Sequence, residues 1–178
     1  MCPIHSRGNP SCLFCSVRGL ALALALVSCG AGSQAGGPPI TVQASPGTLA
    51  WALTEYAVRE WSEAGVPVVQ GPGGVRVSML ARAQVVTICG GVPADGCTTG
   101  LGRGPAPQVY LAEGLSPARA RMAALHEVGH AIRGKASHLD CQGDVPGPDV
   151  MCPSGAAAGT TPTQRDVDFV TWAGDYGP

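Results

Sequence analysis

The sequence predicts an α+β fold for residues 40–178, and three observations support this class. Segments with strand-like and helix-like apolar spacing follow one another in the order strand, helix, several strands, helix, loops and a last helix. A Ser-Pro or Thr-Pro pair precedes each long helical segment, as is common at helix starts. The 26 glycines and 16 prolines are spread along the chain with apolar segments between them, which indicates a loop-rich globular domain.

The first half of this region is expected to hold one long helix and several strands. Leu49, Leu53 and Trp61 recur at helical spacing, so we expect a helix over about 46–64 that ends at Gly65. Short runs that alternate or are rich in β-branched residues predict strands. The expected strands are Ile40–Gln43, Val75–Leu80 and Gln84–Ile88.

The second half is expected to hold a second long helix. Ser116-Pro117 has the composition of a helix N-terminus, and the helix that follows is expected to reach about Arg133. The other expected elements are a loop over Gly90–Pro107, a strand over Gln108–Leu111 and a last helix from near Pro162 to Ala173.

The first 29 residues (1–29) are typical of an export signal peptide. Leu20–Val27 is an apolar run that is too short to span a bilayer. It ends at Leu26-Val27-Ser28-Cys29, which resembles the bacterial lipobox, a motif whose cysteine is lipidated and becomes the mature N-terminus. The resemblance implies an exported protein anchored by Cys29 at the outer membrane or cell surface, with a flexible tether over 30–39. The alternative is an ordinary secretory signal and a secreted protein.

The charge balance argues against one class of partner. The chain has 11 Lys and Arg residues against 12 Asp and Glu residues, a formal net charge of -1. A nearly neutral protein has no electrostatic attraction for a phosphate backbone, so we expect no nucleic-acid partner.

Four cysteines follow Cys29, and an even number in an exported domain indicates two disulfides. Three pairings are possible. We favour Cys89–Cys97 and Cys141–Cys152, because each pair brackets one loop rich in glycine and proline. The alternative is metal ligation by these cysteines, although no C-x-x-C spacing supports it.

The strongest functional pattern is His-Glu-x-x-His at His126–His130, which predicts a Zn²⁺ site. Positions i and i+4 share one face of a helix, so His126 and His130 can bind one ion. Glu127 lies about 100° further round the helix, where it can border the ion and act as general base on a zinc-bound water.

A third protein ligand is required, because two histidines and a water leave tetrahedral zinc one ligand short. Glycine commonly ends helices, so Gly134 lets the chain leave the helix and return with His138. His138 is therefore the candidate third ligand, and Asp140 is the alternative.

These residues resemble the metzincin zinc proteases, and within them the matrixin-like branch. The family pattern is His-Glu-x-x-His-x-x-Gly-x-x-His, and its first five positions match at His126–His130. Gly134 and His138 each follow three residues where the family has two. Asp149–Pro153 resembles the family's Met-turn, which implies that Met151 lies beneath the metal. The last helix and the closing Tyr176-Gly177 resemble the matrixin C-terminus.

The resemblance implies a fold and an activity. The fold would be a small, mixed, twisted sheet packed on two long helices, with a C-terminal subdomain that holds the Met-turn and the last helix. The activity would be zinc-dependent endopeptidase cleavage of a protein or peptide substrate, with Glu127 as general base. We expect a monomer. The alternative is a non-catalytic, metal-binding lipoprotein that retains the metzincin fold. The altered spacing of Gly134 and His138 favours this alternative, whereas Glu127 favours the enzyme, because a metal-binding protein needs no carboxylate there.

Overall fold

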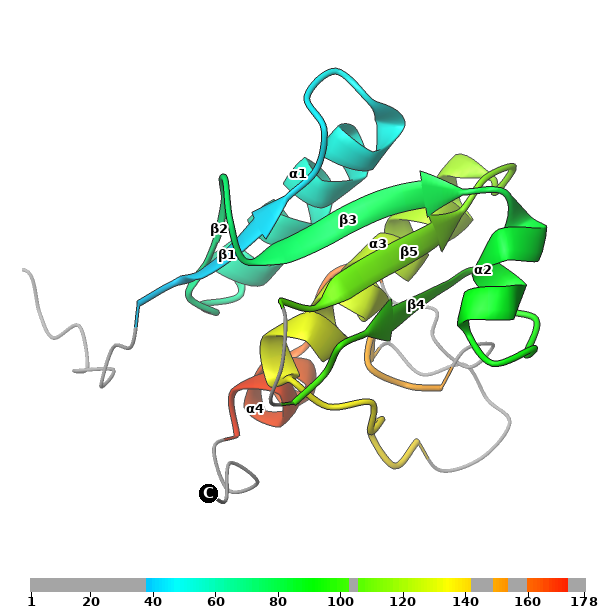
Figure 1. Cartoon of the computed structure of the whole chain (residues 1–178). Coiled ribbons are helices and arrows are strands. Elements are labelled where there is room, and N and C mark those ends of the chain that lie inside the picture. The colour runs from blue at the N-terminus through cyan, green and yellow to red at the C-terminus, as the bar shows by residue number, and fades with distance from the viewer. Residues whose placement is uncertain (1–37, 103–105, 142–148, 154–159, 173–178) are drawn as a thin grey trace, which may run out of the picture. The chain divides into compact units, whose positions relative to one another are not determined.

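The structure is a computed structural model that describes residues 38–102, 106–141, 149–153 and 160–172 (Figure 1). All of them belong to the second of two compact units, which begins at Ala35. The expected signal peptide with Cys29, nearly all of the tether and Tyr176-Gly177 lie outside the described residues. Within the described ranges, no helix combines the length and the apolar character needed to cross a membrane.

The described residues form an α+β fold with one five-stranded mixed sheet and four helices. The strand order is β2-β1-β3-β5-β4, in which β4 runs antiparallel to β5 and the other pairs are parallel. This arrangement makes β4 an edge strand. The strands are β1 (Ile40–Gln43), β2 (Val68–Gln70), β3 (Val75–Leu80), β4 (Gly96–Thr99) and β5 (Gln108–Ala112).

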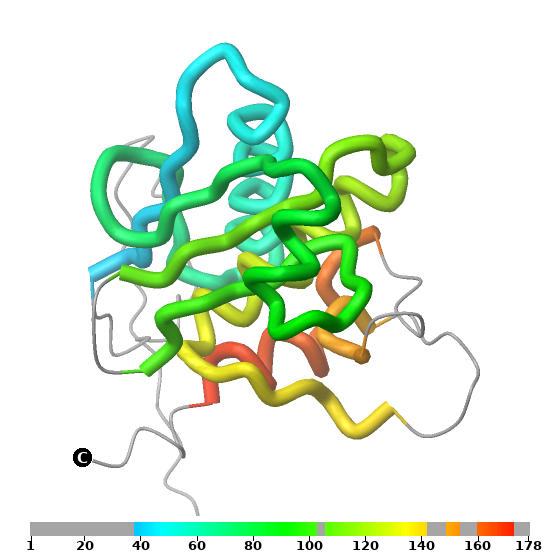
Figure 2. The backbone as a smooth tube through the Cα atoms, turned by 45° about the vertical axis from the view of Figure 1, so that its right-hand side comes forward, coloured from blue at the N-terminus to red at the C-terminus, as the bar shows by residue number. Residues whose placement is uncertain are grey.

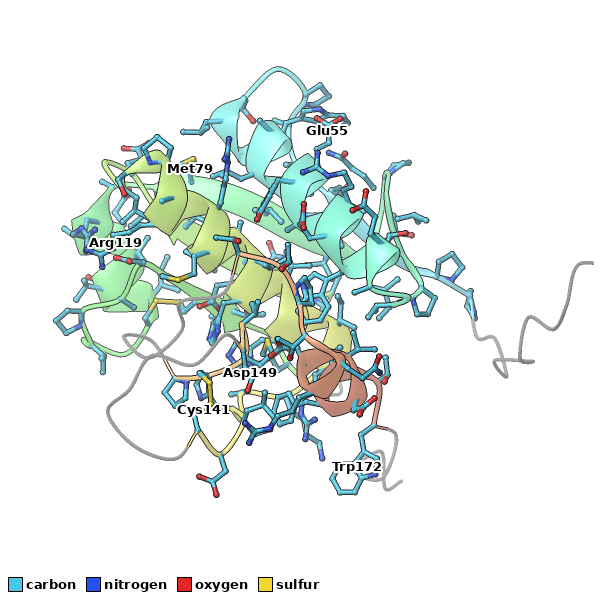
Figure 3. All side chains as sticks on the ribbon, turned by 180° about the vertical axis from the view of Figure 1, so that it is seen from behind. Glu55, Met79, Arg119, Cys141, Asp149 and Trp172 are labelled. Carbon is cyan, nitrogen blue, oxygen red and sulfur yellow. A yellow bond between two sulfur atoms is a disulfide. The ribbon has the colours of Figure 1, made fainter. Side chains whose placement is uncertain are left out.

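Two long helices, α1 (Leu49–Glu63) and α3 (Pro117–Arg133), pack side by side on one face of the sheet (Figures 1 and 3). Between them the indole Nε1 of Trp61, a fully buried side chain, donates a hydrogen bond to the Leu125 carbonyl at 2.9 Å. The core lies between this helix pair and the inner face of the sheet. The short helix α4 (Gln164–Thr171) packs against α3 (Figure 2).

The helix ends follow the predicted chemistry with small shifts. Ser116 caps α3 by accepting a bond from Arg119 N, and Gly134 ends it in the left-handed conformation, with φ 73°. Helix α1 is capped by Thr48, so it begins three residues later than expected. Helix α4 is capped by Thr163, two residues beyond Thr161.

Three segments differ from the sequence prediction. Gln84–Ile88, expected as a strand, belongs to the helix α2 (Arg82–Ile88). Its β-branched residues favour strands only where both a sheet partner and a buried face exist, and here β4 occupies the sheet edge and only Val85 is buried. The expected loop Gly90–Pro107 contains β4, and β2 was not expected at all. Strand β2 has only three residues, and β4 has the sequence Gly-Cys-Thr-Thr within a stretch rich in glycine and proline, which is typical of a loop.

Gly129, in the middle of α3, is required by close packing. A Cβ at this position would lie 2.3 Å from Sδ of Met151 and 2.8 Å from Cζ2 of Trp61. Met151 and Trp61 are both fully buried, so neither side chain has free space to move into. The missing side chain therefore lets Met151 lie directly against α3 at Gly129.

Gly129→Ala is expected to destabilise the protein. Alanine favours a helix over glycine by up to about 1 kcal/mol, but overpacking a core typically costs about 1–3 kcal/mol. We expect a net loss of about 1–2 kcal/mol in the free energy of unfolding, measured by urea denaturation. Gly71→Ala is the control, because its added methyl group would meet Thr41 at an ordinary 3.5 Å. An equal or smaller loss for Gly129→Ala than for Gly71→Ala would contradict this account.

Candidate metal centre

Three histidines from two segments meet at the C-terminal half of α3. His126 and His130 lie one turn apart on the helix, and both are buried. The left-handed turn at Gly134 directs the chain back, and His138 then faces the other two rings. The extra residues on either side of Gly134 therefore do not displace the third imidazole.

The three Nε2 atoms form a nearly equilateral triangle. Its sides measure 3.1 Å between His126 and His130, 3.1 Å between His130 and His138, and 3.2 Å between His126 and His138. If an ion lay about 2.0–2.1 Å from each nitrogen, the usual Zn–N distance, each N–ion–N angle would be about 100°. That value is close to tetrahedral and leaves a fourth position open.

Backbone carbonyls fix the protonation of the two helix ligands. Nδ1 of His126 lies 2.7 Å from the Val150 carbonyl, and Nδ1 of His130 lies 3.0 Å from the Lys135 carbonyl. Because a carbonyl can only accept, each Nδ1 carries the proton and each Nε2 carries a lone pair. Two lone pairs that face each other at 3.1 Å repel unless a cation lies between them, so the geometry fits a bound metal ion.

Desolvation keeps these imidazoles in the form that binds metal. Burial lowers the pKa of His126 despite its hydrogen bond to Val150, and burial also lowers the pKa of His138. Burial, followed by the positive charges that His126 and His138 would carry, lowers the pKa of His130 to about 3. All three rings are therefore neutral at pH 7.

Glu127 borders the histidines and is nearly fully buried. Burial raises its pKa to about 7, partly opposed by a hydrogen bond from Thr98. Oγ1 of Thr98, on the edge strand β4, lies 2.8 Å from both Oε2 and the backbone carbonyl of Glu127. A carboxyl group that titrates near neutral pH is suited to accept a proton and to return it.

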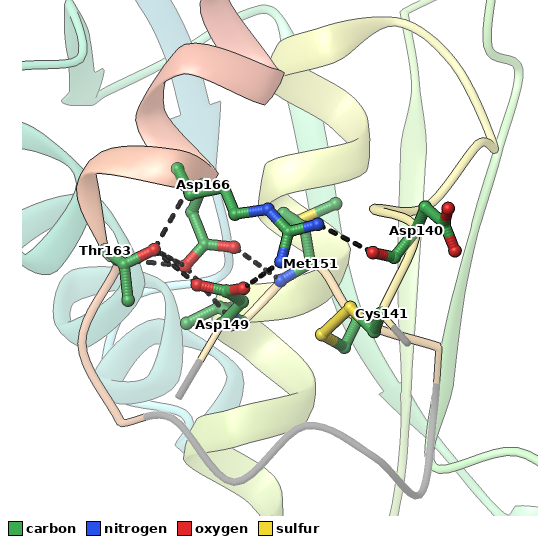
Figure 4. Close-up of polar contacts among 9 residues, drawn as sticks. Asp140, Cys141, Asp149, Met151, Thr163 and Asp166 are labelled. Atoms are coloured by element: carbon green, nitrogen blue, oxygen red, sulfur yellow. Dashed lines mark hydrogen bonds and ion pairs between the residues drawn. A yellow bond between two sulfur atoms is a disulfide. The ribbon is translucent and has the colours of Figure 1, made fainter. Parts of the chain in front are cut away.

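Met151 belongs to a buried turn that carries the carbonyl partner of His126 (Figure 4). The carboxylate of Asp166, at the start of α4, accepts from the backbone N–H of Val150 at 2.9 Å and of Met151 at 2.8 Å. It also accepts from Thr163 N at 2.9 Å, as part of a capping box. Helix α4 thus holds the turn, and the turn orients His126.

Both predicted disulfides are present. Cys89–Cys97 joins α2 to the edge strand β4, and Cys141–Cys152 joins the segment after His138 to the turn that contains Met151. Cys141, Cys152 and Asp149 are close enough to resemble a second ligand cluster. Because both sulfur atoms are bonded to each other, that cluster offers no thiolate to a metal.

A cleft of about 740 Å³ opens over the three histidines and Glu127. It is lined by one face of α3, by the disulfide-closed loop 89–97 and by β4. Apolar side chains such as Met122, Leu101 and Val92 line part of it. At one end Asp95 pairs with Arg119 at 2.6 Å and with Arg82 at 3.3 Å. The cleft is large enough to hold a peptide segment across the metal centre.

The structure brings together all the metal-site residues expected from the sequence and excludes Asp140, which is not in the cluster. Thr98 and Asp166 were not expected. Asp166 had a usable signal, because Thr163-x-x-Asp166 has capping-box spacing. Thr98 had none, since its role depends on the pairing of β4 with β5. No model of a known protein family matches the chain, and no curated protein matches it either.

Proposed function

We propose that this chain is a zinc metalloendopeptidase of the metzincin type. The proposal rests on one arrangement of side chains. The Nε2 atoms of three neutral imidazoles converge beside a buried carboxyl group, and all four side chains line an open cleft. A site that only stores or stabilises a metal usually closes all its positions with protein ligands, whereas a catalytic site keeps one open.

The nature of the ligands favours zinc. Three neutral imidazoles with near-tetrahedral angles are a common set for catalytic zinc, and no described carboxylate belongs to the cluster. Imidazole also binds copper and nickel, so the bound metal has to be measured. When bound, zinc would polarise the substrate carbonyl and make a water molecule acidic enough to react near pH 7.

The residues of the chain would supply the other parts of the reaction. Glu127 would accept a proton from the attacking water and pass it to the leaving amine. Thr98 would hold the Glu127 carboxyl group in place at 2.8 Å. In the described chain β4 pairs only with β5, so an extended substrate could align along the other edge of β4. Val150 would keep His126 in the tautomer that binds metal.

Two further features support the assignment to the metzincin type and to the cell envelope. Met151 is buried against Gly129 of α3, in the turn whose Val150 carbonyl accepts from His126, and this supports the methionine that the family pattern has beneath the metal. Cys29 follows an apolar run in a lipobox-like sequence, which supports an exported, lipid-anchored protein, and the two disulfides fit an oxidising compartment.

Removal of the metal is expected to abolish peptide cleavage. The purified, oxidised protein should contain one zinc per chain by elemental analysis and should cleave members of a broad, fluorogenic peptide library. A chelator should remove both the zinc and the activity, and one equivalent of Zn²⁺ should restore cleavage. The control is Mg²⁺, which prefers oxygen ligands and should restore nothing.

Two outcomes would contradict the proposal. A protein without stoichiometric metal would contradict the zinc site itself. Stoichiometric zinc without cleavage of any library peptide would instead support the second candidate function, a non-catalytic, metal-binding lipoprotein.

A further inference from the structure

We propose that the Cys141–Cys152 disulfide, together with Arg165, positions the third metal ligand, so that retention of the metal depends on the oxidised state of the protein. The inference rests on the metal site of the proposed function but not on catalysis, because metal affinity can be measured without any substrate.

The three ligands are not held equally well. His126 and His130 lie on a buried helix, and a backbone carbonyl fixes each ring at Nδ1. His138 lies beyond the helix end on an exposed segment. Among the described residues, no hydrogen bond holds the Nδ1 atom of His138. Its position therefore depends on what holds the chain on either side of it.

Three links tie the residues just after His138 to the turn that contains Met151, and Figure 4 shows two of them, the disulfide and the side-chain bonds to Asp140 and Asp149. Leu139 N donates to the Met151 carbonyl at 3.0 Å. Cys141 is bonded to Cys152. Arg165 donates from Nη2 to the Asp140 carbonyl at 2.6 Å and from Nη1 to the Asp149 carboxylate at 2.9 Å.

The same turn also holds the first ligand. Val150 accepts the hydrogen bond from Nδ1 of His126, and Met151 packs against Gly129. His138 is therefore coupled to His126 through the turn, and of the three links only the disulfide is covalent. Loss of an outer-shell group that orients a metal ligand typically lowers metal affinity about 10- to 100-fold.

Reduction would break this coupling by a balanced reaction. A water-soluble phosphine reduces the disulfide: the S–S bond breaks, both sulfurs become thiols, and the phosphine gains the oxygen atom of a water molecule. The protons of that water go to the two sulfurs. A phosphine is preferable to a dithiol here, because thiolates would compete for zinc.

The second disulfide provides a matched control. Cys89–Cys97 borders the same cleft, but it joins the end of α2 to β4, and within the described ranges neither cysteine bonds a ligand histidine or the turn that contains Met151. The experiment therefore compares full-length wild-type protein with two double variants, Cys141→Ser/Cys152→Ser and Cys89→Ser/Cys97→Ser. The zinc dissociation constant of each is measured by competition with a chromogenic chelator, and circular dichroism checks the fold.

We expect the dissociation constant to rise about 10- to 100-fold in Cys141→Ser/Cys152→Ser and by less than about 3-fold in the control pair. Arg165→Ala should shift it in the same direction by a smaller factor. If Cys141→Ser/Cys152→Ser does not fold, phosphine treatment of the wild-type holoprotein replaces it. Zinc release should then follow the appearance of alkylatable Cys141 and Cys152, and not that of Cys89 and Cys97, in mass spectrometry.

Four results would overturn the inference. Equal zinc affinity in the wild type and in Cys141→Ser/Cys152→Ser would show that the Cys141–Cys152 disulfide is not needed to position His138. An equal loss in both double variants would show a general effect of lost stability. Zinc release that follows reduction of Cys89–Cys97 would show that metal retention depends on the control disulfide and not on Cys141–Cys152. A wild-type protein that binds no zinc would overturn the proposed function as well. The other three results leave the zinc site in place and overturn only the role of the disulfide.

Discussion

Glu127→Gln is expected to leave zinc bound and to lower the rate of peptide cleavage by about 10²- to 10⁴-fold, the range typical of a lost general base. Glutamine has nearly the same shape and can still accept the hydrogen bond from Thr98. It cannot take a proton from water. The three imidazoles are untouched, so zinc content should stay at one per chain, and the loss should fall on kcat more than on KM.

The matched control for this variant is Glu55→Gln, which makes the same change at an exposed position of α1. It should leave kcat unchanged. Zinc-dependent cleavage that persists in Glu127→Gln at more than about a tenth of the wild-type rate would remove Glu127 from the role of general base.

Asp166→Asn is expected to lower the free energy of unfolding by about 2–4 kcal/mol and to weaken zinc binding. The carboxylate is completely buried and accepts from the backbone N–H groups of Val150, Met151 and Thr163. An asparagine would turn an amide N–H₂ group toward at least one of these donors. The turn would then lose its anchor, and with it the carbonyl that orients His126.

Asp168→Asn is the matched control on the same helix, because Asp168 is exposed and bonds only the nearby Gln164 among the described residues. Its effect on stability should stay within about 0.5 kcal/mol. Zinc affinity is measured in both variants at a temperature where each remains folded. A stable Asp166→Asn protein with wild-type zinc affinity would show that α4 does not position the metal site.

Hydrophobic spacing predicted the parts of the fold that have a long buried face. The helices α1 and α3 could be predicted because each presents a repeated apolar stripe to the core, and Ser116 and Gly134 mark the ends of α3. The region of Gln84–Ile88 could not be assigned correctly, because its β-branched residues indicate a strand unless the position of β4 is known. The strands β2 and β4 could not be recognised either, whereas β1, which is also four residues long, could be, because Ile40–Gln43 alternates in polarity.

The metal site was predictable for a related reason. His126, Glu127 and His130 lie within one helical turn, so their relative positions follow from helix geometry alone. His138 was predictable from the helix end at Gly134, although not its exact orientation. Thr98 reaches the site through sheet pairing between distant segments, which no local pattern encodes. For Asp166 the capping-box spacing marks the start of α4, but not the docking of α4 on the turn.

The anchoring of the Met151 turn by Asp166 also affects the order in which the protein can assemble. The first ligand, His126, precedes Asp166 by about forty residues, and a chain is synthesised from its N-terminus at roughly 5–20 residues per second. At that rate the stretch from His126 to Asp166 takes about 2–8 s to synthesise, and α1, the five strands and α3 all precede Asp166 in the chain. The proposed metal site is therefore complete only once α4 has been made and docked, because Asp166 anchors the turn that orients His126.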